Sequence, residues 1–240
     1  MPETPIAAAP PLLTVTQSET ATTITLDDGK ATAMSPRMLA AVNEALDAAE
    51  AAEHVVVLSG RPGVFSGGFD LKVLGAGGPD ATAMLQAGFA LLHRVASFPT
   101  PVIAACSGHG LALGSFLLLA ADYRIGTAGA FKIGANEVAI GMTMPYAAIE
   151  LLNARINPAY LHRSVMLAEI FTPEGAVAAG FFDELSSPDD LAARAQAVAA
   201  DFAKLDKAAY LGTKLRVRKA LLANMLSGTA AEFHGVARQS

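Results

Sequence analysis

Residues 54–70, HVVVLSGRPGVFSGGFD, contain the pattern from which the fold can be inferred. The segment 54–59 is apolar and rich in β-branched residues, which is typical of a strand buried on both faces. The chain leaves this strand through Ser66, Gly67 and Gly68. Two adjacent glycines allow backbone conformations and close approaches that are closed to other residues. Either another part of the protein or a ligand approaches them.

A second glycine corner follows a second apolar strand. The strand is predicted at 102–106, the corner is SGHGLALG, and the helix after it, LALGSFLLLAA (111–121), is apolar on every side and therefore buried. Strands and helices alternate in this way up to about residue 145. This alternation predicts an α/β core with a largely parallel sheet.

The remaining elements fit the same architecture. Strand pairs or short strands are predicted within 12–30, 122–127 and 131–134. Helix starts are predicted at Ser35-Pro36, Asp80, Asn157-Pro158, Thr172-Pro173 and Ser187-Pro188. After Pro145 the pattern is almost wholly helical. We therefore predict a core of residues 1–185 and a helical segment, 186–240, that packs on the core or on another subunit.

Composition narrows the class of protein. The chain has 240 residues, of which 52% are hydrophobic, enough for a large core, and its net charge is −5. It shows no basic cluster, so nucleic acid is not expected as a partner. Residues 1–13 lack the pattern of a signal peptide, and the longest apolar run is about half a membrane span. A single cysteine, Cys106, fits a reducing compartment, and we expect a cytoplasmic protein without membrane contact.

The two glycine corners are candidate binding sites. In a parallel sheet they lie at the carboxyl ends of strands, where ligands usually bind. Unpaired N–H groups at both corners could converge as an oxyanion hole, which stabilises negative charge on a substrate oxygen. The alternative is that Gly67 and Gly68 only relieve a tight turn.

Other chemistries have less support. Neither a dinucleotide fingerprint nor a P-loop occurs, and Ser107 lacks the flanking glycines of a nucleophile elbow. No pair of the five histidines has metal spacing, so no metal is expected; His109, beside the second corner, is the one worth testing. Cys106, at the end of an apolar strand, is expected to be buried and inert.

Glu137 stands apart from the other acids. It lies in GANEVAIGM, with small residues before it and apolar residues after it. Such a carboxylate is either a residue of a surface loop or a desolvated base with a raised pKa. The spacing leaves both interpretations open.

Four stretches, in order, resemble the enoyl-CoA hydratase/isomerase (crotonase) superfamily. They are LDDGKATAMS, FSGGFDLKVL, PVIAACSGHGLALGSFLLLAADYRI and FKIGANEVAIGMTMP, and the last is similar to the "NE" segment of the Δ3-Δ2-enoyl-CoA isomerases. The resemblance covers about residues 12–185. It implies a crotonase-like ββα spiral core and a helical C-terminal segment that forms trimers.

The resemblance also implies roles for single residues. An acyl-CoA thioester would accept hydrogen bonds from the N–H groups of Phe69 and Leu113, although many members have glycine where Leu113 stands. Of the two glutamates of the hydratases, one position is Phe116 here and the other is Glu137. One carboxylate suffices to move a double bond but serves hydration poorly, so Glu137 is expected to be the only acid/base of an isomerase. Asp70 is expected to tie its corner together rather than to act in the chemistry.

The substrate would contact a set of residues that belongs to the two corners and to the motif before them. These are Lys30, Ala31, Ser66, Gly67, Gly68, Phe69, Asp70, Leu71, Leu111, Leu113 and Phe116. Coenzyme A arrives with the substrate, so no separate cofactor is implied, and the expected assembly is a homotrimer or a dimer of trimers. Two alternatives remain: another enzyme on this fold, such as a hydratase or thioester hydrolase that uses His109, or an acyl-CoA-binding protein without catalysis.

Overall fold

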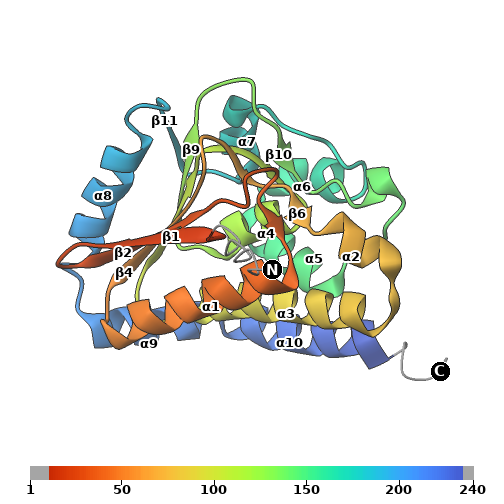
Figure 1. The fold of residues 1–240 in the computed structure, drawn as a ribbon, viewed down its shortest axis with the longest axis horizontal. Helices are drawn as coiled ribbons and strands as arrows, with labels where there is room; N and C mark the ends of the chain where they lie inside the picture. The colour runs from red at the N-terminus through yellow and green to blue at the C-terminus, as the bar shows by residue number, and fades with distance from the viewer. Residues whose placement is uncertain (1–10, 235–240) are drawn as a thin grey trace, which may run out of the picture.

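The computed structural model describes residues 11–234, which are built around a six-stranded sheet (Figure 1). The strand order is β1-β2-β4-β7-β9-β11, and only the pair of β1 and β2 is antiparallel. The strands are β1 (Leu13–Gln17), β2 (Ala21–Leu26), β4 (Val55–Gly60), β7 (Val102–Cys106), β9 (Tyr123–Thr127) and β11 (Glu184–Ser186). The prediction of a largely parallel α/β sheet is confirmed.

Strand β4 is buried on both faces, as its sequence predicts. Val56 and Leu58 belong to the larger hydrophobic core, whereas Val55 and Val57 belong to a smaller one under α8 (Leu191–Phe202). The alternation arises because successive side chains of a strand point to opposite faces. Helix α8 therefore covers one face of the sheet, and the larger core covers the other.

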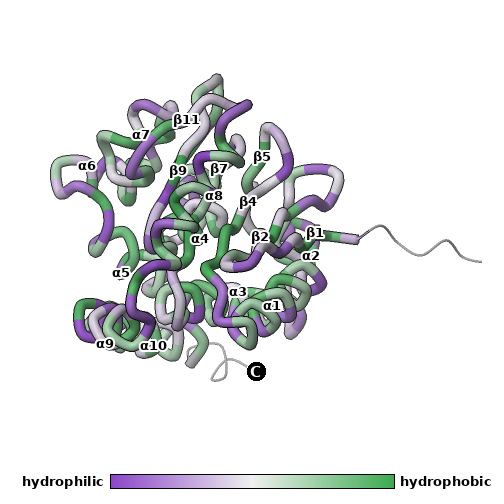
Figure 2. Tube along the Cα trace, turned by 90° about the vertical axis from the view of Figure 1, so that its left-hand side faces the viewer, coloured by the Kyte–Doolittle hydropathy of each residue, from purple (hydrophilic) through white to green (hydrophobic). Residues whose placement is uncertain are grey.

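Three helices contribute many of the side chains of the larger core. They are α1 (Pro36–Ala51), α3 (Gly78–Ser97) and α4 (Leu113–Ala120). Every residue of α4 is buried, which confirms the prediction of a helix that is apolar all round. In Figure 2, α4 has the hydrophobic colour and lies in the middle of the molecule.

Three of the predicted helix starts are confirmed by their caps. Ser35 accepts a hydrogen bond from Met38 N–H, and the Asn157 and Thr172 side chains cap α6 (Pro158–Val165) and α7 (Pro173–Ala179). Each side chain satisfies an N–H group that the helix leaves unpaired.

Two predicted starts are displaced. Helix α3 begins at Gly78 behind Gly77, which has a φ of +67°, so Asp80 lies in the first turn and does not cap it. An acidic residue is still favourable there because of the helix dipole. Helix α8 begins at Leu191, because Ser187 bonds to Asp190 in the turn before it.

Two small sheets lie beside the large one, and of their strands only the one at 133–134 falls within a predicted strand, 131–134. Parallel strands β5 (Gly63–Ser66), β8 (Gly108–Leu111) and β10 (Ile133–Gly134) form one, with β8 in the middle. Strands β3 (Ala33–Met34) and β6 (Gly68–Phe69) form the other, and α2 (Leu71–Ala76) follows. These strands are short and rich in glycine, so they carry no hydrophobic periodicity. The helix predicted from residue 111 begins at Leu113, because β8 takes the residues before it.

The chain after residue 145 is mainly helical, as predicted, apart from the unpredicted edge strand β11. Helix α5 (Tyr146–Arg155) packs against α10 (Lys219–His234), which also packs against α3. Helix α9 (Lys207–Val217) joins α8 to α10, and Figure 1 shows α9 and α10 below the sheet. Within this chain, then, the C-terminal helices pack on the core.

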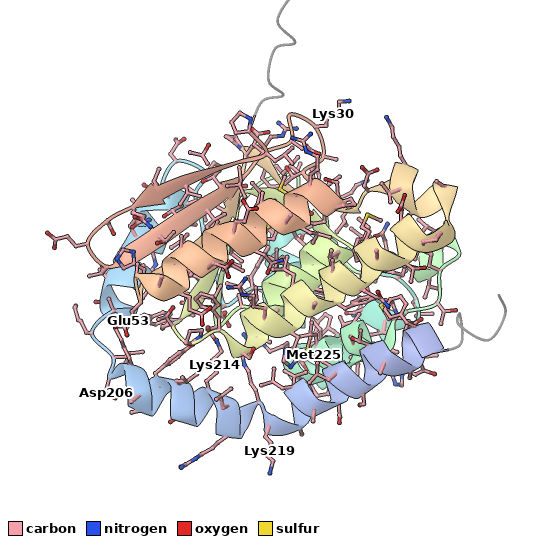
Figure 3. The ribbon with its side chains drawn as sticks, turned by 60° about the horizontal axis from the view of Figure 1, so that its bottom comes forward. Lys30, Glu53, Asp206, Lys214, Lys219 and Met225 are labelled. Carbon is pink, nitrogen blue, oxygen red and sulfur yellow. The ribbon has the colours of Figure 1, made fainter. Side chains whose placement is uncertain are left out.

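A buried charged cluster fastens α9 and α10 to the sheet. The Lys214 Nζ lies 2.9 Å from Asp122 Oδ2 and 3.0 Å from the Phe98 carbonyl oxygen. The Arg218 Nη2 lies 3.0 Å from Asp122 Oδ1. In Figure 3 the Lys214 side chain points inward from α9. Burial lowers the pKa of Lys214 to about 8, although Asp122 counteracts it.

Among residues 11–234, no helix combines the length and apolar character that crossing a membrane requires. The prediction about a signal peptide concerns residues that fall largely outside the described part of the chain.

Candidate active site

The three-stranded sheet brings the site segments together. Strand β8 pairs with β5 on one side and with β10 on the other, with Gly110 opposite both Ser66 and Ile133. Because all three strands are parallel, the chain leaves them at one edge. The first glycine corner, the start of α4 and the segment that carries Glu137 therefore begin side by side.

Gly68 shows what approaches the first glycine corner. Its φ is +99°, and a Cβ on it would lie 2.7 Å from the Ala112 Cβ and 3.4 Å from the Leu113 nitrogen. The second corner thus packs directly against the first. The tight turn that needs Gly68 also places the Leu113 nitrogen beside this corner, so the turn does not exclude a binding site, which stays a prediction.

Leu113 is the first residue of α4, so its N–H has no partner within the helix. Phe69 ends β6, one residue after Gly68. The two residues predicted as oxyanion donors therefore lie on the two corners that meet. An N–H group is present whatever the side chain, so leucine in place of glycine at position 113 does not remove the donor.

The loop before β3 supports the first corner. The Ser66 Oγ donates to the Thr32 carbonyl at 2.9 Å, and Gly67 N–H donates to the Ala31 carbonyl at 2.9 Å. Arg61 also donates to the carbonyl of Lys30. The motif at 30–31 and the glycine corner, separated by more than thirty positions in the sequence, are therefore directly hydrogen-bonded.

Asp28, which the sequence analysis did not single out, organises that loop. Its carboxylate accepts from the N–H groups of Lys30, Thr32 and Ala33 at 2.7–2.8 Å. Burial opposes ionisation, but these three donors and the positive charge of Arg61 together outweigh it and lower the pKa of Asp28. An Asp-Gly pair at a predicted turn is the signal that could have identified this residue.

A hollow of about 200 Å³ lies over the first corner. It is lined by Ala31, Ala33, Gly67, Gly68, Phe69, Asp70, Leu71 and Lys72. The Asp70 carboxylate accepts from Lys72 N–H at 2.9 Å and caps α2, in agreement with the prediction that it ties the corner together. The Leu71 side chain is exposed, and the Lys30 side chain projects from the surface in Figure 3.

Glu137 is buried, so the surface-loop interpretation is wrong. Only 5% of its surface is exposed, and its Oε2 has no hydrogen-bond partner among the described residues. Burial raises the pKa of Glu137 to about 7, and a hydrogen bond from its own backbone lowers it slightly. A carboxyl with a pKa near neutral can both take up and release a proton at physiological pH. The Oδ1 of Asn136, which the sequence analysis did not select, is also buried and has no hydrogen-bond partner within residues 11–234.

Three apolar residues that were predicted to contact the substrate occupy different depths. Leu113 and Phe116 are each 1% exposed and belong to the larger core, whereas Leu111 on β8 is half-buried. Phe116 therefore presents hydrocarbon, and no ionisable group, at its position on α4.

His109 and Cys106 have structural contacts. The His109 Nδ1 accepts a hydrogen bond from Lys132 N–H at 3.0 Å, and its ring meets that of Phe131 edge-on. It thus supports the pairing of β8 with β10. Cys106 is fully buried, and burial raises the pKa of its thiol to about 12, which agrees with the prediction that it is inert. Within residues 11–234, no three acidic, histidine or cysteine side chains are placed to share a metal ion.

Two further residues of the site carry no clear sequence signal. A Cβ on Gly88 of α3 would lie 2.4 Å from the Phe69 ring and 3.2 Å from the Leu113 Cδ2. Ala112 has a φ of +50°, although it is not a glycine. A glycine within a helix and an alanine in an apolar run look unremarkable in sequence, and only the packing reveals their positions.

Comparison with known proteins places this site in a family. Residues 16–234 match the family model described as enoyl-CoA hydratase/isomerase. A family protein from Pseudomonas syringae is 46% identical, with a TM-score of 0.90 over 92% of this chain and 96% of that one. A Mycobacterium tuberculosis protein is 42% identical, with a TM-score of 0.88 over 92% and 99%; it is described as an enoyl-CoA isomerase in one structure and as a probable enoyl-CoA hydratase in another.

Curated relatives match over a shorter length. The "Probable enoyl-CoA hydratase EchA17" of Mycobacterium tuberculosis is 32% identical over 139 residues, which are 57% of this chain and 52% of that relative. The match thus spans about half the length of these curated relatives. The family model covers almost all of the described residues, and the structural similarity extends over the whole fold. This chain belongs to the enoyl-CoA hydratase/isomerase family.

Proposed function

We propose that this protein is an enoyl-CoA isomerase that converts 3-enoyl-CoA into 2-enoyl-CoA. The observation that carries the proposal is the buried carboxyl of Glu137, whose Oε2 has no hydrogen-bond partner among the described residues, together with Phe116 at the position of the second acid. Moving a double bond requires one group that transfers one proton. Adding water requires a base for the water and an acid for the α-carbon, and a phenyl ring can be neither.

The proposed mechanism uses the two corners and Glu137. The thioester carbonyl oxygen accepts hydrogen bonds from Phe69 N–H and Leu113 N–H. The Glu137 carboxylate removes a proton from the α-carbon, and the electron pair of that C–H bond passes into a dienolate whose negative charge lies on the thioester oxygen. Glu137 then returns the proton to the γ-carbon, which leaves the double bond between the α- and β-carbons. Each oxyanion donor typically contributes about 3–4 kcal/mol to such a transition state.

The coenzyme A portion would follow the hollow over the first corner. Four of the residues that line the hollow are alanine or glycine, which suits a slender pantetheine arm. Lys30, which directly precedes the lining residue Ala31, projects from the surface (Figure 3). We propose that coenzyme A enters as part of the substrate and that neither a further cofactor nor a metal takes part. We also propose that the protein assembles as a homotrimer or a dimer of trimers.

A hydratase is the second candidate, because the curated relative named above is described as one. It would need a second polar group to hold the water. His109, the candidate from the sequence, has its Nδ1 engaged with Lys132, which disfavours this role. An acyl-CoA-binding protein without catalysis is the third candidate, but it gives no reason for a buried carboxyl whose Oε2 has no partner among the described residues.

Parallel turnover assays distinguish the three candidates. The protein is supplied with 3-enoyl-CoA in one assay and with 2-enoyl-CoA in the other. We expect 2-enoyl-CoA from the first and little 3-hydroxyacyl-CoA from the second. Efficient formation of 3-hydroxyacyl-CoA would refute the isomerase and leave the hydratase. Tight binding of both thioesters without turnover would indicate a binding protein.

A further inference from the structure

The side chains of the two donor residues meet at one glycine. The Phe69 ring lies over Gly88 of α3, where a Cβ would be 2.4 Å from two of its atoms, and the Leu113 side chain reaches the same glycine. The Phe69 ring also meets Phe89 edge-on, with ring centroids 6.0 Å apart, and Phe89 in turn contacts Phe233 of α10. Packing therefore holds the Phe69 ring in place beside the thioester site.

A largely apolar groove lies along the same helix, α3, close to Gly88. It has a volume of about 810 Å³, lies between α1, α2 and α3, and is lined among others by Leu39, Ala40, Val73, Ala83, Met84 and Ala87. Lys72 lines both this groove and the hollow over the first corner. Ala87, one of the residues that line the groove, directly precedes Gly88, on which the Phe69 ring rests.

We propose that the Phe69 ring, seated on Gly88, closes the route from the thioester site to this groove and so limits the length of the acyl chain that binds. This inference rests on the proposed function, because it assumes that an acyl-CoA occupies the site. The occupant of the opened groove would be the far end of the acyl chain, whose hydrocarbon matches the apolar lining. The Phe69 N–H would donate to the thioester oxygen, and the Phe69 side chain would set which lengths of acyl chain can bind.

Binding of saturated acyl-CoAs tests the inference without any reaction. Affinities for butyryl-CoA and decanoyl-CoA are measured by calorimetry with the natural protein and with Phe69→Ala, which keeps the backbone N–H. Each methylene moved out of water contributes roughly fourfold in affinity. In the natural protein we expect decanoyl-CoA to bind little more tightly than butyryl-CoA. In Phe69→Ala we expect the ratio of the two affinities to be larger by at least about tenfold.

Gly88→Ala provides a second, independent variant. Its Cβ would displace the Phe69 ring in the natural protein, whereas in the Phe69→Ala background both contacts at 2.4 Å are gone and the next contact is the Leu113 Cδ2 at 3.2 Å. We therefore expect Gly88→Ala on its own to change the ratio of decanoyl-CoA affinity to butyryl-CoA affinity. When Phe69→Ala is already present, the same change should alter this ratio much less. This non-additivity is the signature of two residues that act through one contact.

Phe202→Ala is the matched control. Phe202 packs edge-on against Tyr123, on the α8 face of the sheet, so its loss also removes a packed ring. We expect its affinity ratio to equal that of the natural protein. If the natural protein binds neither thioester, the proposed function fails and this inference with it. If it binds them but Phe69→Ala and Gly88→Ala leave the ratio unchanged, the proposed function stands and this inference is overturned.

Discussion

Gly68 and Leu113, 45 positions apart in the sequence, are in contact: a Cβ on Gly68 would lie 3.4 Å from the Leu113 nitrogen. The contact requires a residue without a side chain at position 68, with a φ of +99°. Replacement of this glycine therefore tests how the two corners fit together.

We predict that Gly68→Ala lowers both stability and activity. The new Cβ would be 2.7 Å from that of Ala112, and the backbone conformation disfavours an L side chain. We expect a loss of about 2 kcal/mol in the free energy of unfolding, measured by urea denaturation. Gly212→Ala is the control, because Gly212 lies in α9 with no atom within 4 Å of its Cβ position, and there we expect a gain of about 0.5–1 kcal/mol. Equal effects of the two changes would contradict the close fit.

We predict that Glu137→Gln reduces isomerisation by several orders of magnitude and leaves thioester affinity nearly unchanged. Glutamine keeps the shape of the side chain but cannot accept the α-proton. The measurements are kcat on 3-enoyl-CoA and calorimetric affinity for a saturated acyl-CoA. An unaffected kcat would remove Glu137 from the mechanism.

The same residue predicts opposite pH dependences of activity and stability. Catalysis needs the carboxylate, so the rate should rise with pH through about 7, the pKa of Glu137 in the folded chain. The folded state binds the Glu137 proton more tightly than the unfolded state, in which the pKa is about 4.5. This stabilisation is complete below pH 4.5 and is lost as pH rises through 7.

At about 1.4 kcal/mol per pH unit, the contribution of Glu137 to the free energy of unfolding falls by about 3 kcal/mol across that window. Urea denaturation from pH 4.5 to pH 8 measures the change, and Glu137→Gln is the matched control because it cannot ionise. The difference in stability between the two proteins should vary with pH in this direction. A difference that does not vary would mean that Glu137 ionises in the folded chain as it does in water.

We predict that Asp122→Ala destabilises the protein by about 3–5 kcal/mol. The change leaves the buried Lys214 ammonium without its carboxylate partner, and it also removes the acceptor of Val102 N–H. The matched control is Lys207→Ala, which breaks an ion pair with Glu53 in which both side chains are largely exposed. Thermal unfolding compares the two variants, and the control should behave like the natural protein. A similar response of both would show that the Asp122 cluster does not fasten α9 and α10.

The sequence predicts the large sheet because its strands carry their own signal. Val56 and Val57 are apolar on successive positions, which occurs where both faces of a strand are covered. The helix starts at Ser35, Asn157 and Thr172 were predictable for a similarly local reason, since one side chain satisfies one N–H group a few positions away.

The site was predictable only as separate pieces. The glycine corners and Glu137 stand out in the sequence, but the pairing of β5, β8 and β10 that gathers them uses backbone groups common to almost all residues. The burial of Glu137 depends on distant elements packing around it, so its neighbours in the sequence could not decide between a surface loop and a buried base. Gly88 acquires its importance only from the ring that lies over it.

The order of the site segments along the chain has a consequence for folding during synthesis. The segments that form the site lie between residues 63 and 137; they are β5, β8 and β10, together with Gly88 and Glu137. Helix α10 is the last described helix, so it is synthesised well after them. Chains fold from the N-terminus as they emerge, at roughly 5–20 residues per second. We expect the growing chain to assemble the walls of its site several seconds before Phe233 reaches Phe89, so that an apolar face of α3 is exposed to chaperones until synthesis is nearly complete.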